Sequence, residues 1–324
     1  MRIGLCVRGF AGILKILREQ LPEDEVFECD QSELAMLAPT ADVLVPTICP
    51  IPAPIFEGRR LKLVQQYGVG LDSIDMATAT EAGVPVCNVP SVGTGNAESV
   101  AELAIAHLLM LSRDIPDAIQ QFKLKKVGAP LGHCLWGSTV CIVGYGGVGE
   151  EIARRLQGFG VRIIAVSKTG PNGSRLRDTT VKIDLHVDQS LLLDVVREAD
   201  FVIVGAPATP ENKGLVSRSV LSSMKSTAYI VNVARGPVID YEALREALEE
   251  EKIAGAGLDV FWNEPFDPND PIFGQNVIAT PHIGGSTERS LLGVGRAVAC
   301  NIERLRNGET LKDCANPSAT SDGI

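Results

Sequence analysis

Three residues able to process an organic acid stand at the ends of predicted strands. They are Arg235 in N-V-A-R-G-P-V-I-D, Glu264 in L-D-V-F-W-N-E-P and His282 in I-A-T-P-H-I-G-G. Ligands of open parallel sheets bind at the carboxyl ends of the strands, so these three side chains are candidates for one site. A guanidinium matches a planar carboxylate, and an imidazole titrates near neutral pH. The trio predicts that Arg235 grips a 2-oxo acid and that His282, oriented and kept protonated by Glu264, donates a proton to its ketone.

Each of these residues also has an ordinary interpretation that the sequence leaves open. Arg235 could be a surface arginine, and Glu264 a solvated loop carboxylate. His107, within A-E-L-A-I-A-H-L-L-M, is interpreted as helix packing, whereas His133 and His186 have no companion motif.

A glycine-rich turn upstream predicts a dinucleotide site. The segment T-V-C-I-V-G-Y-G-G-V-G-E-E-I-A runs from an apolar strand through G-x-G-x-x-G into an amphipathic helix. In such a turn the glycines permit a tight bend, a close backbone approach to the pyrophosphate and close helix–strand packing. The helix N-terminus adds free N–H groups and a partial positive charge. The predicted pyrophosphate-binding residues are Gly144, Gly146, Gly147, Val148 and Gly149. A merely structural turn is the alternative.

Composition restricts the class of protein. The chain has 324 residues, and at roughly 150 residues per domain this length indicates two domains. Acidic residues outnumber basic ones by 40 to 30, which argues against a nucleic-acid or anionic-membrane partner. The eight cysteines form no C-x-x-C pair and suit a reducing cytoplasm, and no apolar run approaches the ~18 residues of a membrane span. We expect a cytoplasmic protein without a metal site.

Short apolar runs alternate with helical patterns, which predicts parallel α/β construction. A helix over Ala97–Ser112 crosses from the first domain to the second, and a helix over Glu288–Arg306 returns. The predicted domains are therefore 1–97 with 287–324, for the substrate, and 98–286, for the dinucleotide. Other strands are expected at Ile3–Val7, Val43–Pro46, Leu63–Gln66, Val84–Cys87, Thr139–Val143, Val161–Val166, Phe201–Val204, Ala228–Val233, Ala254–Val260 and Val277–Ala279, and other helices at Ile13–Leu21, Val148–Gly158, Ser190–Ala199 and Tyr241–Glu250.

The amino-acid sequences of these segments and their order along the chain resemble those of the D-isomer-specific 2-hydroxyacid dehydrogenase family. The resemblance runs from about Val43 to about Arg304. The resemblance implies two Rossmann-like, doubly wound parallel-sheet domains with a cleft between them. The cofactor domain would be inserted into a flavodoxin-like substrate domain. Arg235, Glu264 and His282 match the catalytic arginine, glutamate and histidine of the family. The implied activity is reversible reduction of a 2-oxo acid to a D-2-hydroxy acid by a nicotinamide cofactor.

The same resemblance implies further ligand contacts. In Y-G-V-G-L-D-S-I-D, the N–H groups of Val69 and Gly70 would bind the substrate carboxylate. Asp259 would face the nicotinamide carboxamide, and Pro207 would line the cofactor. The cofactor set also includes Ala234 and Gly284, next to the catalytic residues.

The strand V-R-I-I-A-V departs from the family pattern at its end. An Asp or Glu there binds the ribose hydroxyls of NAD and repels a 2′-phosphate. Here Ser167, Lys168 and Thr169 follow the strand, and Arg175 and Arg177 come soon after. The departure favours NADP over NAD, although a lysine that points into water would leave the choice between them open.

Substrate and assembly are predicted from two other segments. V-P-T-I-C-P-I-P, expected at the cleft, carries no Arg or Lys, which favours glyoxylate, hydroxypyruvate or pyruvate over the phosphorylated acid of phosphoglycerate dehydrogenases. The helix Ala97–Ser112 and the segment containing Phe122 and Trp136 resemble the dimer arm of the family, so we expect a homodimer, unless these aromatic residues merely cover the second domain. Phosphoglycerate dehydrogenase and a non-enzymatic, NAD(H)-sensing co-repressor-like scaffold are the alternative functions. Formate dehydrogenase, which has the same architecture but typically has glutamine in place of Glu264, resembles the chain less.

Overall fold

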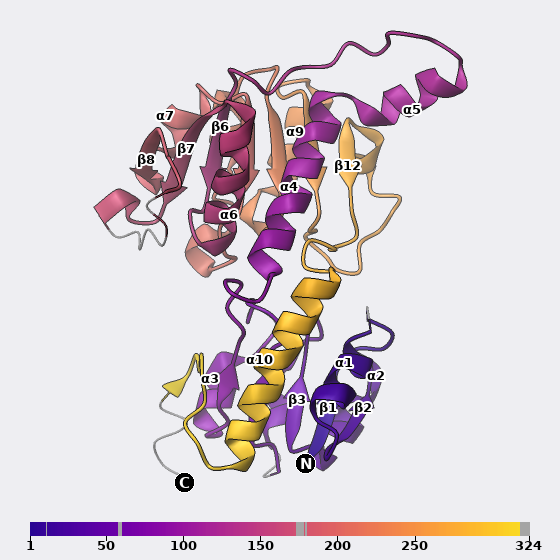
Figure 1. The fold of residues 1–324 in the computed structure, drawn as a ribbon, viewed down its shortest axis with the longest axis vertical. Coiled ribbons are helices and arrows are strands. Elements are labelled where there is room, and N and C mark those ends of the chain that lie inside the picture. The colour runs from indigo at the N-terminus through magenta and orange to yellow at the C-terminus, as the bar shows by residue number, and fades with distance from the viewer. Residues whose placement is uncertain (11, 58–59, 173–177, 179, 318–324) are drawn as a thin grey trace. The chain divides into compact units, whose positions relative to one another are not determined.

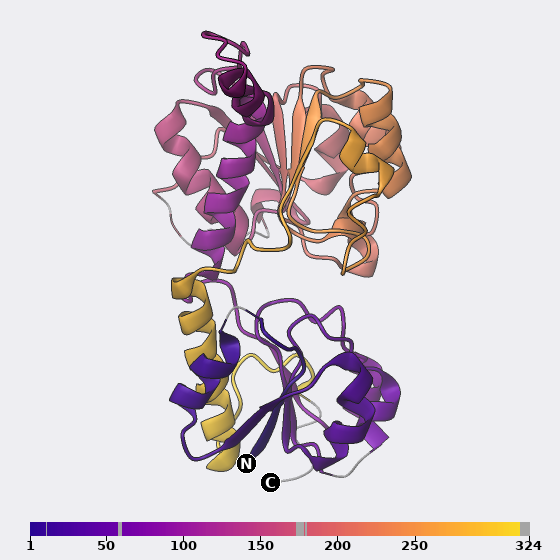
Figure 2. The ribbon, with the colours of Figure 1, turned by 90° about the vertical axis from the view of Figure 1, so that its right-hand side faces the viewer.

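The structure is a computed structural model that describes residues 1–10, 12–57, 60–172, 178 and 180–317 (Figure 1). Arg175 and Arg177 lie outside the described residues. The chain forms two compact units, Met1–Asn96 with Ser286–Ile324, and Ala97–Gly285. The second unit is thus inserted into the first. In each unit, helices lie on both sides of a parallel sheet (Figure 2).

The first unit contains a five-stranded parallel sheet in the order β2-β1-β3-β4-β5. Its helices α1 and α10 cover one face through residues such as Leu17 and Val298, and α2 and α3 cover the other through Leu34 and Ala79. This strand order is that of flavodoxin-like doubly wound folds. The elements are β1 (Arg2–Leu5), α1 (Ile13–Gln20), β2 (Glu25–Glu28), α2 (Gln31–Leu37), η1 (Ala38–Thr40), β3 (Val43–Val45), η2 (Ala53–Glu57), β4 (Leu63–Gln65), α3 (Met76–Glu81), β5 (Val86–Cys87) and α10 (Glu288–Arg306).

The second unit contains a seven-stranded parallel sheet in the order β12-β11-β10-β9-β6-β7-β8. The elements are α4 (Asn96–Ser112), α5 (Ile115–Lys123), β6 (Thr139–Val143), α6 (Gly147–Leu156), η3 (Gln157–Phe159), β7 (Arg162–Ser167), η4 (Gly170–Asn172), β8 (Leu185–Asp188), η5 (Gln189–Leu191), α7 (Leu192–Val196), β9 (Phe201–Val204), η6 (Pro210–Asn212), α8 (Arg218–Ser223), β10 (Tyr229–Asn232), η7 (Gly236–Val238), α9 (Tyr241–Glu249), β11 (Gly255–Leu258), η8 (Pro271–Gly274) and β12 (Val277–Ala279).

The strand order of the second unit reverses direction at β6. From there the chain builds outward first through β7 and β8, and then through β9 to β12 on the other side. Helices α4 and α6 cover one face of the sheet, and α7, α8 and α9 cover the other. Ligands of doubly wound sheets bind at the carboxyl ends of the strands beside such a reversal. The predicted fold class of two doubly wound parallel-sheet domains, one inserted into the other, is confirmed.

The central strands form because their sequences are apolar and β-branched. All four residues of β9, F-V-I-V, are buried, as are four of the five in β6, T-V-C-I-V, and strands covered on both faces need such sequences. The sequence patterns did not predict β2, β8, α2, α3, α5 or α8. The helix expected at Ser190–Ala199 is shorter, because η5 comes before α7. No helix among the described residues is long and apolar enough to span a membrane.

Candidate active site

His282 and Glu264 form a hydrogen-bonded ion pair in the second unit. The Nδ1 atom of His282 lies 2.7 Å from Oε2 of Glu264, and Oε1 of Glu264 accepts the N–H of Phe261 at 3.1 Å. The side chains of His282 and Glu264 are 32% and 22% exposed, so solvent reaches the pair. Because a carboxylate only accepts hydrogen bonds, Nδ1 carries a proton, and Nε2 is the nitrogen available to exchange a proton with a ligand.

The Glu264 carboxyl is held in its charged form. Its partial burial raises the pKa, but the hydrogen bond and charge of His282, the Phe261 N–H and the charge of Arg235 outweigh burial, and the net pKa lies below its usual value. The carboxylate is therefore ionised at neutral pH. The negative charge therefore lies against the His282 ring, which is a candidate general acid.

Asp259 anchors the loop that carries His282. Its Oδ1 accepts the Thr280 hydroxyl at 2.7 Å and the Ile283 N–H at 2.9 Å, and its Oδ2 accepts the Gly284 N–H at 2.8 Å. Asp259 is 1% exposed, and His282 adopts a φ of 53°, a left-handed conformation that is uncommon outside glycine. The backbone of the two residues that follow His282 is thus held by the Asp259 carboxylate, which restricts the position of the His282 ring.

Arg235 follows β10 in a turn that Asn232 shapes. The buried Asn232 donates from Nδ2 to the Arg235 carbonyl at 3.0 Å and accepts the Ala234 N–H at 3.0 Å. The Nη1 of Arg235 donates to the Ala234 carbonyl at 2.8 Å. A Cβ at Gly236 would lie 2.1 Å from the carbonyl carbon of Phe261, so this turn packs on the segment that leads to Glu264. The fold therefore brings the three predicted catalytic residues into one region.

The glycine-rich turn after β6 fits a pyrophosphate group. Gly144 has a φ of 104°, and a Cβ there would lie 2.3 Å from the Ala206 nitrogen. A Cβ at Gly149 would lie 2.3 Å from the Gly144 oxygen, whereas one at Gly146 would meet nothing within 4 Å. Helix α6 begins at Gly147 with no side chain capping it. Open space over Gly146 beside an uncapped helix N-terminus is what a bound phosphate requires.

Ser167, at the end of β7, already has partners within the protein. Its hydroxyl lies 2.9 Å from Nε2 of His186 and donates to the Gly170 carbonyl at 3.2 Å. Burial lowers the pKa of His186, whose ring packs against Tyr145 at 5.2 Å between centroids. Lys168 is exposed. His186 is thus a second polar group beside the serine, and no sequence motif indicated it.

Two loops carry the other residues predicted to contact ligands. In the first unit, the Val69 carbonyl accepts from Nδ2 of Asn88 at 2.8 Å, and the Gly70 carbonyl accepts from Nε2 of Gln66 at 2.5 Å. In the second unit, the Pro207 carbonyl accepts from Nδ2 of Asn212 at 2.9 Å. Both loops are therefore shaped by a buried or partly buried amide side chain, which the sequence patterns did not indicate.

Comparison with known proteins identifies the family. Residues 105–284 match the model for the D-isomer specific 2-hydroxyacid dehydrogenase, NAD binding domain. The chain belongs to the D-isomer specific 2-hydroxyacid dehydrogenase family. It is 38% identical over 312 residues to the glyoxylate reductase of Thermococcus onnurineus. The alignment covers 91% of this chain and 90% of the relative.

Two solved structures of nicotinamide-dependent enzymes superpose well on this dehydrogenase. The NADPH-dependent glyoxylate/hydroxypyruvate reductase of Sinorhizobium meliloti, in complex with NADP and malonate, has a TM-score of 0.80 and 29% identity over 98% of this chain and 97% of that one. The NAD-dependent formate dehydrogenase of Staphylococcus aureus, in complex with NAD, has a TM-score of 0.80 and 27% identity over 97% of this chain and 98% of that one. The chain is an NAD(P)-dependent oxidoreductase of 2-hydroxy acids.

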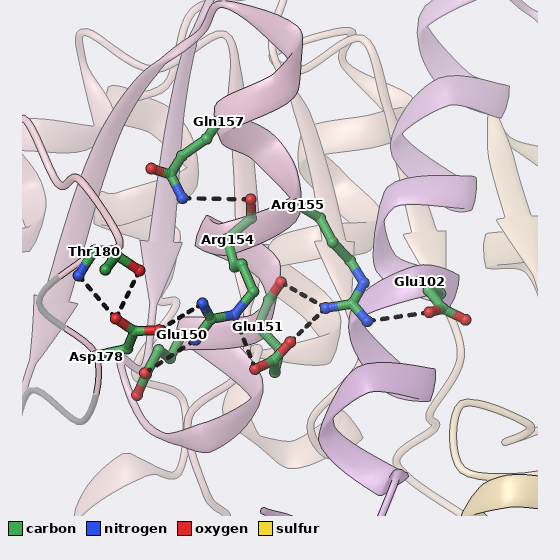
Figure 3. Close-up of polar contacts among 8 residues, drawn as sticks. All are labelled: Glu102, Glu150, Glu151, Arg154, Arg155, Gln157, Asp178 and Thr180. Carbon is green, nitrogen blue, oxygen red and sulfur yellow. Dashed lines mark hydrogen bonds and ion pairs between the residues drawn. The ribbon is translucent and has the colours of Figure 1, made fainter.

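Ion pairs join α6, the helix that follows the glycine-rich turn, to neighbouring segments (Figure 3). Arg155 bonds Glu151 at 2.5 Å and reaches Glu102 on α4 at 3.0 Å. Arg154 bonds Asp178 at 2.7 Å, and hydrogen bonds from Thr180 together with this arginine lower the pKa of Asp178 to about 2. Exposed pairs contribute little individually. Their arrangement nevertheless links α6, which starts at the predicted pyrophosphate site, to α4 and to the segment beyond β7.

Proposed function

We propose that this dehydrogenase interconverts a small, unphosphorylated 2-oxo acid, such as glyoxylate, hydroxypyruvate or pyruvate, and its D-2-hydroxy acid, with His282 as the proton donor in reduction. The observation that carries the proposal is the 2.7 Å contact between His282 Nδ1 and the ionised Glu264. It leaves Nε2 to act on the substrate oxygen. A solvent-accessible imidazole beside a carboxylate, with an arginine near it, suits acid catalysis on an anionic 2-oxo acid.

The protein's own groups divide the remaining work. When bound, the nicotinamide cofactor supplies or accepts the hydride. Arg235 and the N–H groups of Val69 and Gly70 bind the substrate carboxylate, which fixes the ketone relative to His282. Glu264 keeps the His282 ring oriented before and after transfer, and solvent, which reaches the pair, supplies the proton that recharges the ring. Cofactor contacts are assigned to Gly144, Gly146, Gly147, Val148, Gly149, Ser167, Lys168, Pro207, Ala234, Asp259 and Gly284.

The absence of cations in one segment supports a small substrate. The residues from Val45 to Pro52, V-P-T-I-C-P-I-P, include no Lys or Arg that could bind a phosphate. The name of the Thermococcus relative, glyoxylate reductase, supports the same choice.

Initial-rate kinetics over a panel of 2-oxo acids tests the proposed function. Glyoxylate, hydroxypyruvate, pyruvate and 3-phosphohydroxypyruvate would each be reduced with NADH and with NADPH. We expect kcat/KM for at least one unphosphorylated acid to exceed that for the phosphorylated acid by about tenfold, equivalent to ~1.4 kcal/mol. A preference for the phosphorylated acid would overturn the substrate assignment, and no turnover of any acid would overturn the function.

We further propose that NADP is preferred over NAD. Ser167 and Lys168 stand where a carboxylate would repel the 2′-phosphate, and the Sinorhizobium enzyme is described as NADPH-dependent. The His186 ring lies beside Ser167, so a phosphate group bound there would have two polar side chains close to it. Replacing Ser167 with Asp reinstates the repulsion and a ribose contact, so the ratio of kcat/KM for NADH to that for NADPH should rise by about tenfold or more.

The matched control for this replacement is Ser167→Asn, which is similar in size but uncharged. It should change the cofactor ratio far less than Ser167→Asp does. A wild-type kcat/KM for NADH well above that for NADPH would show that Ser167 and Lys168 do not read the phosphate.

We also propose that the enzyme is a homodimer. Helix α5 and the segment after it extend from the sheet of the second unit (Figure 1) and expose large apolar side chains. Phe122 is 83% exposed, Leu131 97% and Trp136 79%. Several large exposed apolar side chains on one segment support a role in a protein–protein interface. Light scattering at micromolar concentration should give twice the 34.5 kDa mass of one chain, and a monomeric mass would refute the dimer.

A further inference from the structure

We infer that His107 is a positioning residue for the reaction, because a chain of hydrogen bonds through Thr280 and Asp259 lets it hold the loop that carries His282. The inference rests on the proposed role of His282 as proton donor. It concerns a side chain that touches neither substrate nor cofactor in the proposed function.

His107 lies on α4, in the interior of the second unit. It is 0% exposed, and its Nε2 lies 2.9 Å from the Thr280 hydroxyl. Its Nδ1 has no hydrogen-bond partner among the described residues. Burial lowers the pKa of His107, and the charge of Asp259 opposes this only in part, so the ring is neutral at physiological pH. A buried polar nitrogen without a hydrogen-bond partner destabilises the folded protein. A histidine at this position therefore suggests that the hydrogen bond made by Nε2 has a function.

The hydrogen bonds that join His107, Thr280 and Asp259 can point in only one direction, because Thr280 has a single hydroxyl hydrogen to donate. The Asp259 carboxylate can only accept, and Thr280 donates its single hydroxyl hydrogen to Oδ1 at 2.7 Å. The Thr280 oxygen is therefore an acceptor towards His107, which must carry its proton on Nε2. The bonds run one way, from His107 to Thr280 to Asp259, and bonds aligned in this way strengthen one another.

This series of hydrogen bonds ends at the loop that carries His282. Asp259 accepts the N–H groups of Ile283 and Gly284, the two residues directly after His282. A Cβ at Gly284 would lie 3.0 Å from Asp259 Oδ2, so the backbone of Gly284 packs closely against the carboxylate. A change in how Thr280 orients the carboxylate would therefore shift the backbone beside His282.

Strand β11 contains a matching recess for the ring. A Cβ at Gly257 would lie 2.7 Å from His107 Nδ1 and 3.0 Å from its Cβ. Glycine weakens a strand interior and often marks a close approach by another group. Here the approaching group is the imidazole, so Gly257 and His107 are complementary in shape.

A histidine that only filled space would behave differently from one that positions the loop. His107→Leu fills the recess, removes the unpartnered nitrogen and removes the donor to Thr280. Space filling predicts unchanged kcat. Positioning predicts that kcat falls about tenfold, since small misplacements of catalytic groups cost that much or more, while the thermal midpoint stays at or above the wild-type value.

The kinetic test compares His107→Leu, His107→Gln and Thr280→Val in the full-length enzyme, with the best 2-oxo acid of the panel. Glutamine has an N–H donor near the place of Nε2, so His107→Gln should keep kcat within about threefold of the wild type. Thr280→Val should match His107→Leu, and the double variant should be no worse than the poorer single one, because both break the same chain. Wild-type kcat in a folded His107→Leu, or additive losses in the double variant, would overturn the inference.

A second measurement does not depend on turnover. Nitrogen–proton correlation spectra of the histidine rings should show His107 as the neutral, Nε2-protonated form at about pH 7.5, above the pKa of a free imidazole. A ring protonated on Nδ1, or on both nitrogens, would overturn the inference. Failure of the proposed function would appear separately, as normal kcat in His282→Asn.

Discussion

Replacement of His282 by asparagine is expected to lower kcat by about two or more orders of magnitude, the range for loss of a general acid. Asparagine has an N–H group that can reach Glu264, so the loop should remain in place. It has no proton to give to the ketone oxygen. Because Nδ1 of His282 is held by Glu264 at 2.7 Å, the lost function is that of the other ring nitrogen.

Two controls isolate this effect. Cofactor affinity, measured by fluorescence titration, should barely change, because His282 is not among the assigned cofactor contacts. His133→Asn, an exposed histidine on the segment after α5, should retain wild-type kcat. A kcat for His282→Asn within a few-fold of the wild type would show that another group donates the proton.

Replacement of Arg235 by lysine is expected to lower kcat/KM by about 10- to 100-fold for every 2-oxo acid. Lysine keeps the charge but loses the planar fork that matches a carboxylate. Losing a charge-assisted hydrogen bond costs about 1.5–3 kcal/mol, which corresponds to a loss of this size. The turn should also loosen, because Arg235 Nη1 donates to the Ala234 carbonyl.

The control for this change is Arg197→Lys, whose side chain is 63% exposed and 3.6 Å from Asp194. Exposed pairs of this kind contribute little, so wild-type kinetics are expected. The decisive comparison is binding of oxamate, a 2-oxo acid analogue. If oxamate binds Arg235→Lys as tightly as it binds the wild type, Arg235 does not bind the substrate carboxylate.

Most of the fold was predictable because its central strands are continuous apolar runs. The missed strands β2 and β8, E-V-F-E and L-H-V-D, lie at sheet edges, where one face is less covered and polar residues interrupt the pattern. The missed helix α2 has seven residues, too few for periodicity to register. Its start was nevertheless visible as a capping box, Asp30 with Glu33, which the structure contains.

The site was predictable where chemistry lies within one short motif. Gly144, Gly146 and Gly149 are close in sequence, and the trio of Arg235, Glu264 and His282 each follows a strand. The contact of Ser167 with His186 was not predictable, because it depends on how β7 and β8 pair. The series of hydrogen bonds that starts at His107 was not predictable either, because it depends on which residue of α4 faces β11. Its only visible signal was Gly257 within a buried strand.

The central claim is that an imidazolium held by an ionised Glu264 supplies the proton. The pH dependence of kcat/KM for reduction, in the wild type and in Glu264→Gln, tests it most directly. Reduction needs the protonated ring, so the rate falls at alkaline pH. The pKa of Glu264 lies below its usual value, so its negative charge is present beside the ring throughout the neutral range. Removing that charge should move the alkaline limb to lower pH by about one unit or more. Alkaline limbs that coincide in the two proteins would contradict the account.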